Sequence, residues 1–253
     1  MPVELTVKAI LFDMDGTLVD STPAVEKTMG DWCHEQGIEP SEFFQHSHGV
    51  RTQDNLKRFQ RVPVPGSSLS PEQLDDSVNR LEALIAENGR LMHEAGGKGI
   101  ERLPGADVLL RALKKGGARW GICTSATRIY ASSALKTGEI TEVPFIVTAN
   151  DVTHGKPHPE PYLKGIEEAR KMQGVPFEAS DVLVVEDAPS GLKAGLAAGC
   201  KTLGVGTGQP LERFRTFEAT VKALDLTRVE VLSASADAVT LRIKTLEEEE
   251  NAA

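Results

Sequence analysis

ILFDMDGTLVDS, residues 10–21, is the most informative segment of the chain for its architecture. It begins inside a short apolar run, residues 7–12, which predicts a buried strand. Asp13 and Asp15 follow directly and stand two residues apart, so in an extended chain both carboxylates point the same way. Two such carboxylates repel each other unless a proton or a cation lies between them, and Mg²⁺ suits an all-oxygen site of this kind. Gly16 then lets the backbone turn tightly or approach a ligand.

Similar apolar runs recur along the chain, with helical segments between them. The runs are RWGICT (119–124), PFIVT (144–148), DVLVVE (181–186) and TLGVG (202–206). The expected helices are one after Pro104, one over 127–137, one after Pro159 and one from Pro189 to Gly199, since proline near the start and glycine past the end are typical of helices. This alternation predicts an α/β fold, a Rossmann-like parallel sheet with helices on both faces.

Residues 20–98 interrupt this pattern with helical periodicity and no convincing strand. Ser70 and Gln73 form a capping-box pattern, which opens a helix after an expected loop over 61–71. The apolar positions expected on one side of this helix are Leu74, Val78, Leu81, Leu84, Ile85, Leu91 and Met92. We therefore expect a core of residues 1–19 and 99–253 and a helical cap of residues 20–98, placed as a lid over the ligand-binding end of the sheet.

The end of the chain carries weaker signals. Segments 229–232 and 239–243 are expected to form a hairpin. The acidic run 247–250 is expected to be a solvated, mobile tail.

Composition excludes several classes of protein. Among 253 residues, 28 Lys and Arg face 37 Asp and Glu, and the resulting net charge of −9 argues against nucleic acid or an anionic membrane as the main partner. No apolar run approaches the roughly 18 residues of a membrane span, and the N-terminus does not resemble a secretion signal. Three scattered cysteines, Cys33, Cys123 and Cys200, indicate reduced thiols in a cytoplasmic chain, which we expect to be a monomer.

Three further segments place polar side chains at the ends of expected strands. Ser125, with Thr124 as the neighbouring alternative, stands between a strand and a helix start, where a hydroxyl can bind a phosphoryl oxygen together with backbone N–H groups. In GKPHPEP (155–161) two prolines stiffen the loop that carries Lys156, which can then serve as a fixed cation. Glu186-Asp187 end another apolar run, where paired acids are unusual.

These four segments, in this order, resemble the signature motifs of the haloacid dehalogenase (HAD) superfamily of aspartate-nucleophile phosphatases. The resemblance covers residues 7–206. It implies that Asp13 is the nucleophile, that Asp15 is the general acid and base, and that Ser125 and Lys156 act on the phosphoryl group. It also implies binding of the substrate by Gly16, Thr17 and Ala126. The implied cofactor is Mg²⁺, with the metal-binding residues Asp13, Asp15 (through its backbone carbonyl), Glu186 and Asp187.

Within that superfamily, HGVRT (48–52), TSAT (124–127) and VTANDVTHGKPHPEPY (147–162) look like fungal-type glycerol-phosphate and 2-deoxyglucose-6-phosphate phosphatases. The resemblance implies a small-molecule phosphate ester as substrate, a small polyol or sugar phosphate with glycerol phosphate favoured. The candidates for binding the leaving group are His48, Gly49, Arg51, Thr52 and Asn150. Arg51 offers a forked donor to hydroxyls or phosphate, and a solvated helix start is its alternative role.

Other functions stay open at this point. A broad sugar-phosphate phosphatase and a phosphosugar mutase would use the same aspartates, and a non-catalytic binding protein would be expected to have lost them. No P-loop string occurs. His46 and His48 have no third soft ligand, and Pro157 interrupts any helix between His154 and His158, so we expect no zinc site at either pair.

Overall fold

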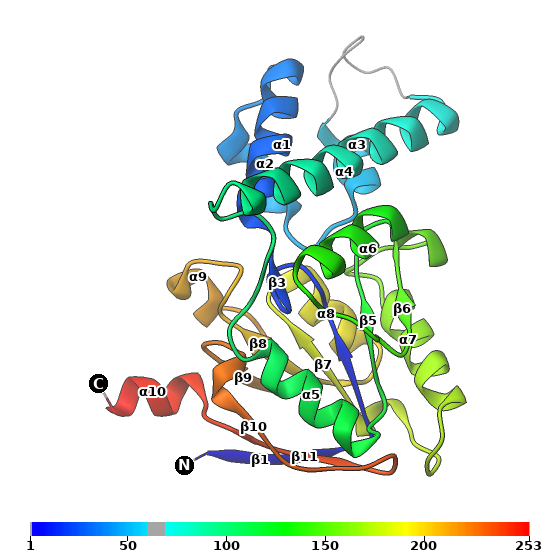
Figure 1. The fold of residues 1–253 in the computed structure, drawn as a ribbon, viewed down its shortest axis with the longest axis vertical. Helices are drawn as coiled ribbons and strands as arrows, with labels where there is room; N and C mark the ends of the chain where they lie inside the picture. Colours follow the sequence, from blue (N-terminus) through cyan, green and yellow to red (C-terminus); the bar gives the residue numbers. More distant parts are fainter. Residues whose placement is uncertain (1, 60–68, 253) are drawn as a thin grey trace.

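The protein is described by a computed structural model that covers residues 2–59 and 69–252, and most of the expected loop 61–71 lies outside this range. Its centre is a sheet of six strands in the order β6-β5-β2-β7-β8-β9, in which all pairs are parallel (Figure 1). The strands are β2 Ala9–Phe12, β5 Trp120–Cys123, β6 Ile146–Val147, β7 Val182–Glu186, β8 Lys201–Val205 and β9 Val221–Ala223. This sheet confirms the predicted Rossmann-like α/β fold. β9 was not predicted.

Side chains of the central strands alternate between two apolar cores, one on each face of the sheet. Ile10 and Phe12 of β2 belong to the larger core, whereas Leu11 belongs to the second. The larger core includes side chains of α5 (Ala106–Gly116) and α6 (Arg128–Thr137). The second includes side chains of α7 (Glu160–Lys171) and α8 (Pro189–Ala197). The four predicted helices of the sheet are therefore present, two on each face.

The first four helices of the chain gather at one end of the molecule (Figure 1). They are α1 Thr22–Gln36, α2 Pro40–Ser47, α3 Thr52–Phe59 and α4 Pro71–Glu94, and we call them the helical segment. The predicted capping box is present: Ser70 Oγ accepts the Gln73 N–H at 3.2 Å, and Gln73 Oε1 accepts the Ser70 N–H at 3.0 Å. The predicted apolar side of α4 was partly wrong, because Leu84 and Leu91 are exposed.

The chain enters and leaves the helical segment through a short antiparallel ribbon. β3 (Val19–Asp20) pairs with β4 (Glu101–Arg102), so the two ends of the segment lie side by side. Residue 20, the expected start of the cap, is the last residue of β3, whereas residue 98, its expected end, comes before β4; the division into core and cap stays a prediction.

A second sheet, with the strand order β1-β11-β10, lies at the opposite end of the molecule (Figure 1). The predicted hairpin is confirmed as β10 (Val229–Ala234) and β11 (Val239–Ile243), and β1 (Val3–Val7) adds an antiparallel strand that we had not predicted. The expected mobile acidic tail was wrong. It forms α10 (Leu246–Ala252), in which Glu249 makes ion pairs with Arg228 at 2.6 Å and Lys244 at 3.0 Å.

The remaining elements are short. They are α9 Leu211–Arg215 and three 3₁₀ turns at Ala149–Asp151, Ala179–Asp181 and Leu226–Arg228. The three cysteines are free and buried, as predicted. In the described part of the chain, no helix is both long enough and apolar enough to cross a membrane.

Candidate active site

The predicted motifs meet at the carboxyl ends of the parallel strands, on the side of the helical segment. β2 lies between β5 and β7, so Asp13, Ser125 and Asp187, which follow these strands, come together where the strand order reverses. Between them and the helical segment is a cavity. Its lining includes Asp13, Asp15, Gly16, His48, Gly49, Thr52, Thr124, Ser125, Ala126 and Asp187 among the predicted residues, together with Ser21, Glu26, Asn55, Glu82, Tyr130 and Gly208.

Lys156 is buried directly behind Asp13. Its ammonium donates to Asp13 Oδ1 at 2.5 Å and to Glu186 Oε1 at 2.7 Å. Burial opposes the charge of Lys156, but the two carboxylates outweigh burial and raise its pKa above the ordinary value. Lys156 is therefore a fixed cation at neutral pH, as the stiff loop predicted, and it occupies one oxygen of Asp13.

Three carboxylates, those of Asp13, Glu186 and Asp187, form the acidic cluster, with one ligand atom of each within 4.8 Å of the others. Burial raises the pKa of Asp187 well above its ordinary value, and the charges of Glu186 and Asp13 raise it further. Burial likewise raises the pKa of Asp13, although Lys156 works against this. If all three acids are ionised, the single ammonium leaves two negative charges, which a divalent cation would balance. An all-oxygen donor set of this size fits Mg²⁺.

Within this cluster Glu186 is already satisfied by protein donors. Its Oε1 accepts Tyr162 Oη–H at 3.0 Å beside the Lys156 contact, and its Oε2 accepts the Ala188 N–H at 2.9 Å. Apart from its own backbone, Asp187 has one weak partner among the described residues, since Thr17 Oγ1 donates to its Oδ1 at 3.4 Å. Asp13 and Asp187 therefore have the free oxygens that a cation needs, and Glu186 orients Lys156.

The carboxylate of Asp15 lies outside the acidic cluster. Ser21 Oγ and Tyr130 Oη both donate to its Oδ1, at 2.6 and 2.7 Å. Burial raises the pKa of Asp15, and these two hydrogen bonds lower it in part. Because both donors occupy Oδ1, the second oxygen, Oδ2, is left to carry a proton. Ser21 and Tyr130 were not predicted as site residues, although a buried tyrosine hydroxyl generally needs a partner.

Two serine hydroxyls that follow strands of the central sheet donate hydrogen bonds to backbone carbonyls in the segment that joins α2 and α3. Ser125 Oγ donates to the Gly49 carbonyl at 2.9 Å, and Ser190 Oγ donates to the His48 carbonyl at 3.2 Å. Gly49 has φ +72°, and a Cβ there would lie 2.4 Å from Ser190 Oγ. The close approach of this segment to the site therefore requires glycine.

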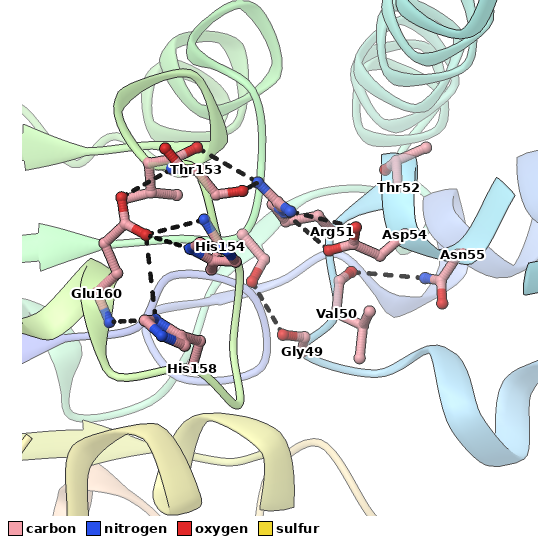
Figure 2. A network of polar contacts seen from close by, with 12 residues as sticks. Gly49, Val50, Arg51, Thr52, Asp54, Asn55, Thr153, His154, His158 and Glu160 are labelled. Atoms are coloured by element: carbon pink, nitrogen blue, oxygen red, sulfur yellow. Dashed lines mark hydrogen bonds and ion pairs between the residues drawn. The ribbon is translucent and has the colours of Figure 1, made fainter. Parts of the chain in front are cut away.

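Arg51 does not line the cavity, contrary to its expected role at the leaving group (Figure 2). Its guanidinium binds Asp54 through Nε at 2.8 Å and through Nη2 at 3.1 Å. Nη1 donates to the carbonyls of Thr153 at 3.1 Å and Val152 at 3.4 Å, on the loop before Lys156. Arg51 thus ties the start of α3 to that loop, because the nearby acid and carbonyls already use its donors.

Two other predicted substrate-binding residues also point elsewhere. Asn150 Oδ1 accepts the Arg128 N–H at 2.8 Å at the start of α6, so it caps a helix outside the cavity. Thr17 is fully buried against Asp187.

Glu82 of α4 lines the cavity and was not predicted as a site residue. Its Oε1 accepts the Thr52 hydroxyl and its Oε2 accepts the Thr127 backbone N–H, each at 2.7 Å. Burial raises the pKa of Glu82 above its ordinary value. Glu82 joins α4 to the start of α6. The N-terminal end of a helix carries partial positive charge, so a carboxylate is favourable there.

The loop after β8 supports the site from another side. Thr207 Oγ1 donates to the Gly16 carbonyl, and a Cβ at Gly208 would lie 1.7 Å from Asp187 Oδ2. The sequence TLGVGTG gave no sign of this contact, because it depends on how the loop turns after the strand.

A family model described as haloacid dehalogenase-like hydrolase matches residues 10–205, most of the chain. The chain belongs to the haloacid dehalogenase-like hydrolase family. This confirms the predicted resemblance and the predicted class of hydrolase.

Several known proteins are similar to this chain over most of its length. The chain is 37% identical to glycerol-1-phosphate phosphohydrolase 1 of Saccharomyces cerevisiae over 95% of its own length and 92% of that protein. It is 32% identical to 2-deoxyglucose-6-phosphate phosphatase 1 of the same yeast, over 95% and 96%. Among solved structures, a hydrolase from Pseudomonas syringae has a TM-score of 0.70 at 25% identity, covering 87% of this chain and 94% of that one. A β-phosphoglucomutase from Clostridium difficile has a TM-score of 0.71 at 20% identity, covering 88% and 93%, which shows a shared fold.

Proposed function

We propose that the protein is a Mg²⁺-dependent phosphatase that hydrolyses a small polyol or sugar phosphate monoester through an aspartyl-phosphate, with glycerol phosphate as the favoured substrate. The observation that carries this proposal is the difference between the contacts of the Asp13 and Asp15 carboxylates. Asp13 is held by Lys156 inside the acidic cluster, whereas Asp15 is held apart by two neutral hydroxyls. One carboxylate is thereby prepared as an anion and the other as a carrier of a proton.

In the first step, the free oxygen of Asp13 attacks phosphorus, and the bond from phosphorus to the ester oxygen breaks. Asp15 gives its proton to the departing alkoxide, which leaves as the alcohol. In the second step, Asp15 takes a proton from water as that water attacks the aspartyl-phosphate, which releases inorganic phosphate and restores Asp13. Lys156 keeps Asp13 ionised through its contact with Oδ1, and Ser125 would stabilise a phosphoryl oxygen by turning its hydroxyl from the Gly49 carbonyl to the substrate. Mg²⁺, held by Asp13 and Asp187 with the Asp15 carbonyl, would neutralise phosphoryl charge.

Residues 20–98 act in this proposal as a cap over the core of residues 1–19 and 99–253. Val25, Phe43, His48 and Glu82 of the helical segment line the same cavity as Asp13. The cap therefore supplies the surroundings of the leaving group. Its closure would exclude water from the first step.

The charges around the cavity support an uncharged leaving group. None of the described residues that line it is Lys or Arg, while Glu26 and Glu82 add carboxylates on the cap side. A second phosphate on the substrate would have no cation there, so the lining disfavours the bisphosphate that a phosphosugar mutase must bind. The names of the two yeast relatives, a glycerol-1-phosphate phosphohydrolase and a 2-deoxyglucose-6-phosphate phosphatase, agree with a polyol or sugar ester.

The test is phosphate release from glycerol phosphate, 2-deoxyglucose 6-phosphate and other sugar phosphates, with Mg²⁺ present or removed by EDTA. We expect the highest kcat/KM for glycerol phosphate, loss of activity in EDTA and recovery on addition of Mg²⁺. Asp13→Asn should abolish turnover and leave the fold intact by circular dichroism. Substantial turnover by the pure variant would refute the nucleophile, and formation of an isomeric sugar phosphate without phosphate release would favour the mutase.

A broad sugar-phosphate phosphatase is the outcome if several substrates give similar kcat/KM values. A non-catalytic binding protein is the outcome if all are inert. The monomeric state and the cytoplasmic location stay predictions.

A further inference from the structure

The loop that carries Lys156 has a second group of metal-ligating side chains on its outer side. His154, His158 and Glu160 each offer one ligand atom within 4.8 Å of the other two (Figure 2). His154 Nδ1 lies 3.0 Å from Glu160 Oε2, and His158 Nδ1 lies 4.0 Å from the same oxygen. The sequence analysis expected no pairing of these histidines because Pro157 prevents a helix. The turn of the loop nevertheless places the two rings 4.6 Å apart.

We propose that His154, His158 and Glu160 form a second metal site, separate from the acidic cluster, which binds a divalent cation of the zinc class. Two imidazoles and one carboxylate are the donors that such ions prefer, whereas Mg²⁺ prefers oxygen alone. Ligand atoms about 2.0–2.1 Å from a tetrahedral zinc stand about 3.3 Å apart. The observed separations of 3.0 and 4.0 Å lie on either side of that value. His158 Nδ1 accepts the Glu160 backbone N–H at 3.2 Å, so the ring must turn away from this hydrogen bond to bind the metal.

Glu160 is already fixed and charged for this role. Its Oε1 accepts the Thr153 N–H at 2.8 Å, and its Oε2 accepts the His154 N–H at 2.9 Å. Hydrogen bonds from these two backbone groups, together with the ring of His154, lower the pKa of Glu160 to about 2. The carboxylate is therefore an anion at any working pH, and it need not lose a proton to bind a metal.

The histidines are accessible from solvent. The side chains of His154 and His158 are 63% and 49% exposed, and that of Glu160 is 22% exposed. Water can complete the coordination shell, so the metal should exchange with solution, unlike a closed structural zinc site.

The proposed metal ligands flank Lys156 in the sequence. A metal bound by residues 154, 158 and 160 would cross-link the chain on both sides of Lys156. The Lys156 ammonium lies 2.5 Å from Asp13 Oδ1. The Lys156 loop should then unfold less readily when the metal is bound.

The experiment is a titration of the whole protein with Zn²⁺, followed by calorimetry, and with Co²⁺, followed by its visible absorption. Excess Mg²⁺ is present throughout to occupy the acidic cluster. We compare wild type with His154→Ala and His158→Ala. His93→Ala is the matched control, because His93 is an exposed histidine at the end of α4 outside both groups of ligands that the described chain offers.

Wild type and His93→Ala should bind one equivalent of Zn²⁺, give the intense absorption of tetrahedral Co²⁺, and unfold at higher temperature with Zn²⁺. His154→Ala and His158→Ala should each weaken this binding at least tenfold while keeping the circular dichroism of wild type. The same titration in Asp187→Asn should still show the site. Equal affinity in wild type and both histidine variants, or no Zn²⁺ binding by wild type at millimolar concentration, would overturn the proposal.

Discussion

Replacing Arg51 by alanine separates two roles for this side chain. If Arg51 reads the leaving group, the variant should lose activity mainly on the natural substrate. If it holds the loop before Lys156, as its contacts with the Val152 and Thr153 carbonyls indicate, the variant should lose stability and should lose activity equally on every phosphate ester. We expect the second result.

The expected loss of stability follows from the contacts. A hydrogen bond from a charged donor contributes about 1.5–3 kcal/mol. Only the bond to Thr153, at 3.1 Å, is both short and long-range, since the bond to Val152 measures 3.4 Å and Asp54 is a local partner. We therefore expect the free energy of unfolding to fall by about 2 kcal/mol. For a chain of this size that is roughly 4–8 °C in Tm.

The assay measures Tm by calorimetry and kcat/KM for glycerol phosphate and for an aryl phosphate. Arg80→Ala is the matched control, because Arg80 is a mostly exposed arginine of α4 whose partner Glu35 lies 3.7 Å away, and such pairs contribute little. A tenfold greater loss on glycerol phosphate than on the aryl ester, with Tm unchanged, would show that Arg51 contacts the leaving group and that our interpretation is wrong.

Two further changes test the surroundings of the site. Tyr130→Phe removes one of two donors to Asp15, so kcat on an alkyl phosphate should fall about tenfold, the equivalent of one 1.4 kcal/mol hydrogen bond. An aryl phosphate, whose leaving group needs no proton, should be affected much less, and equal losses on both would contradict the role of Asp15 as acid. Burial raises the pKa of Glu82, so its contribution to stability is fully present below the ordinary pKa of a glutamate and is lost as pH rises through the raised value. As pH rises from about 4, the Tm of wild type should fall relative to the Tm of Glu82→Gln. A Tm difference that stays constant across pH would contradict this.

Five of the six strands of the central sheet, all except β9, could be predicted because their signals are local. Each buried strand is a short apolar run, and a proline or a glycine marks the start or end of most of the helices. β1 was missed for the opposite reason, since its partner is β11, more than 230 residues later. The alternation of Val3, Leu5 and Val7 was the available signal, but such a pattern does not name its partner strand.

The site residues likewise differ in whether a local sequence signal could predict them. Asp13 and Asp187 were predictable because each directly follows a strand of the sheet. Lys156 was predictable from the prolines that stiffen its loop and from the resemblance of that loop to a family motif. Tyr130 was not, because its contact with Asp15 depends on how α6 is rotated. Arg51 shows a related limit: the sequence identified a forked donor, but only the fold decides which acceptors reach it first.

The ribbon of β3 and β4 holds the two ends of the inserted helices side by side. Because both ends of the insertion leave from neighbouring strands, the core already holds them together and gains no long, open loop that it must close. An insertion of different length or composition could be exchanged at this ribbon with little entropic cost to the core. New leaving-group preferences could then evolve by replacement of a module, while the aspartates of the core stay unchanged.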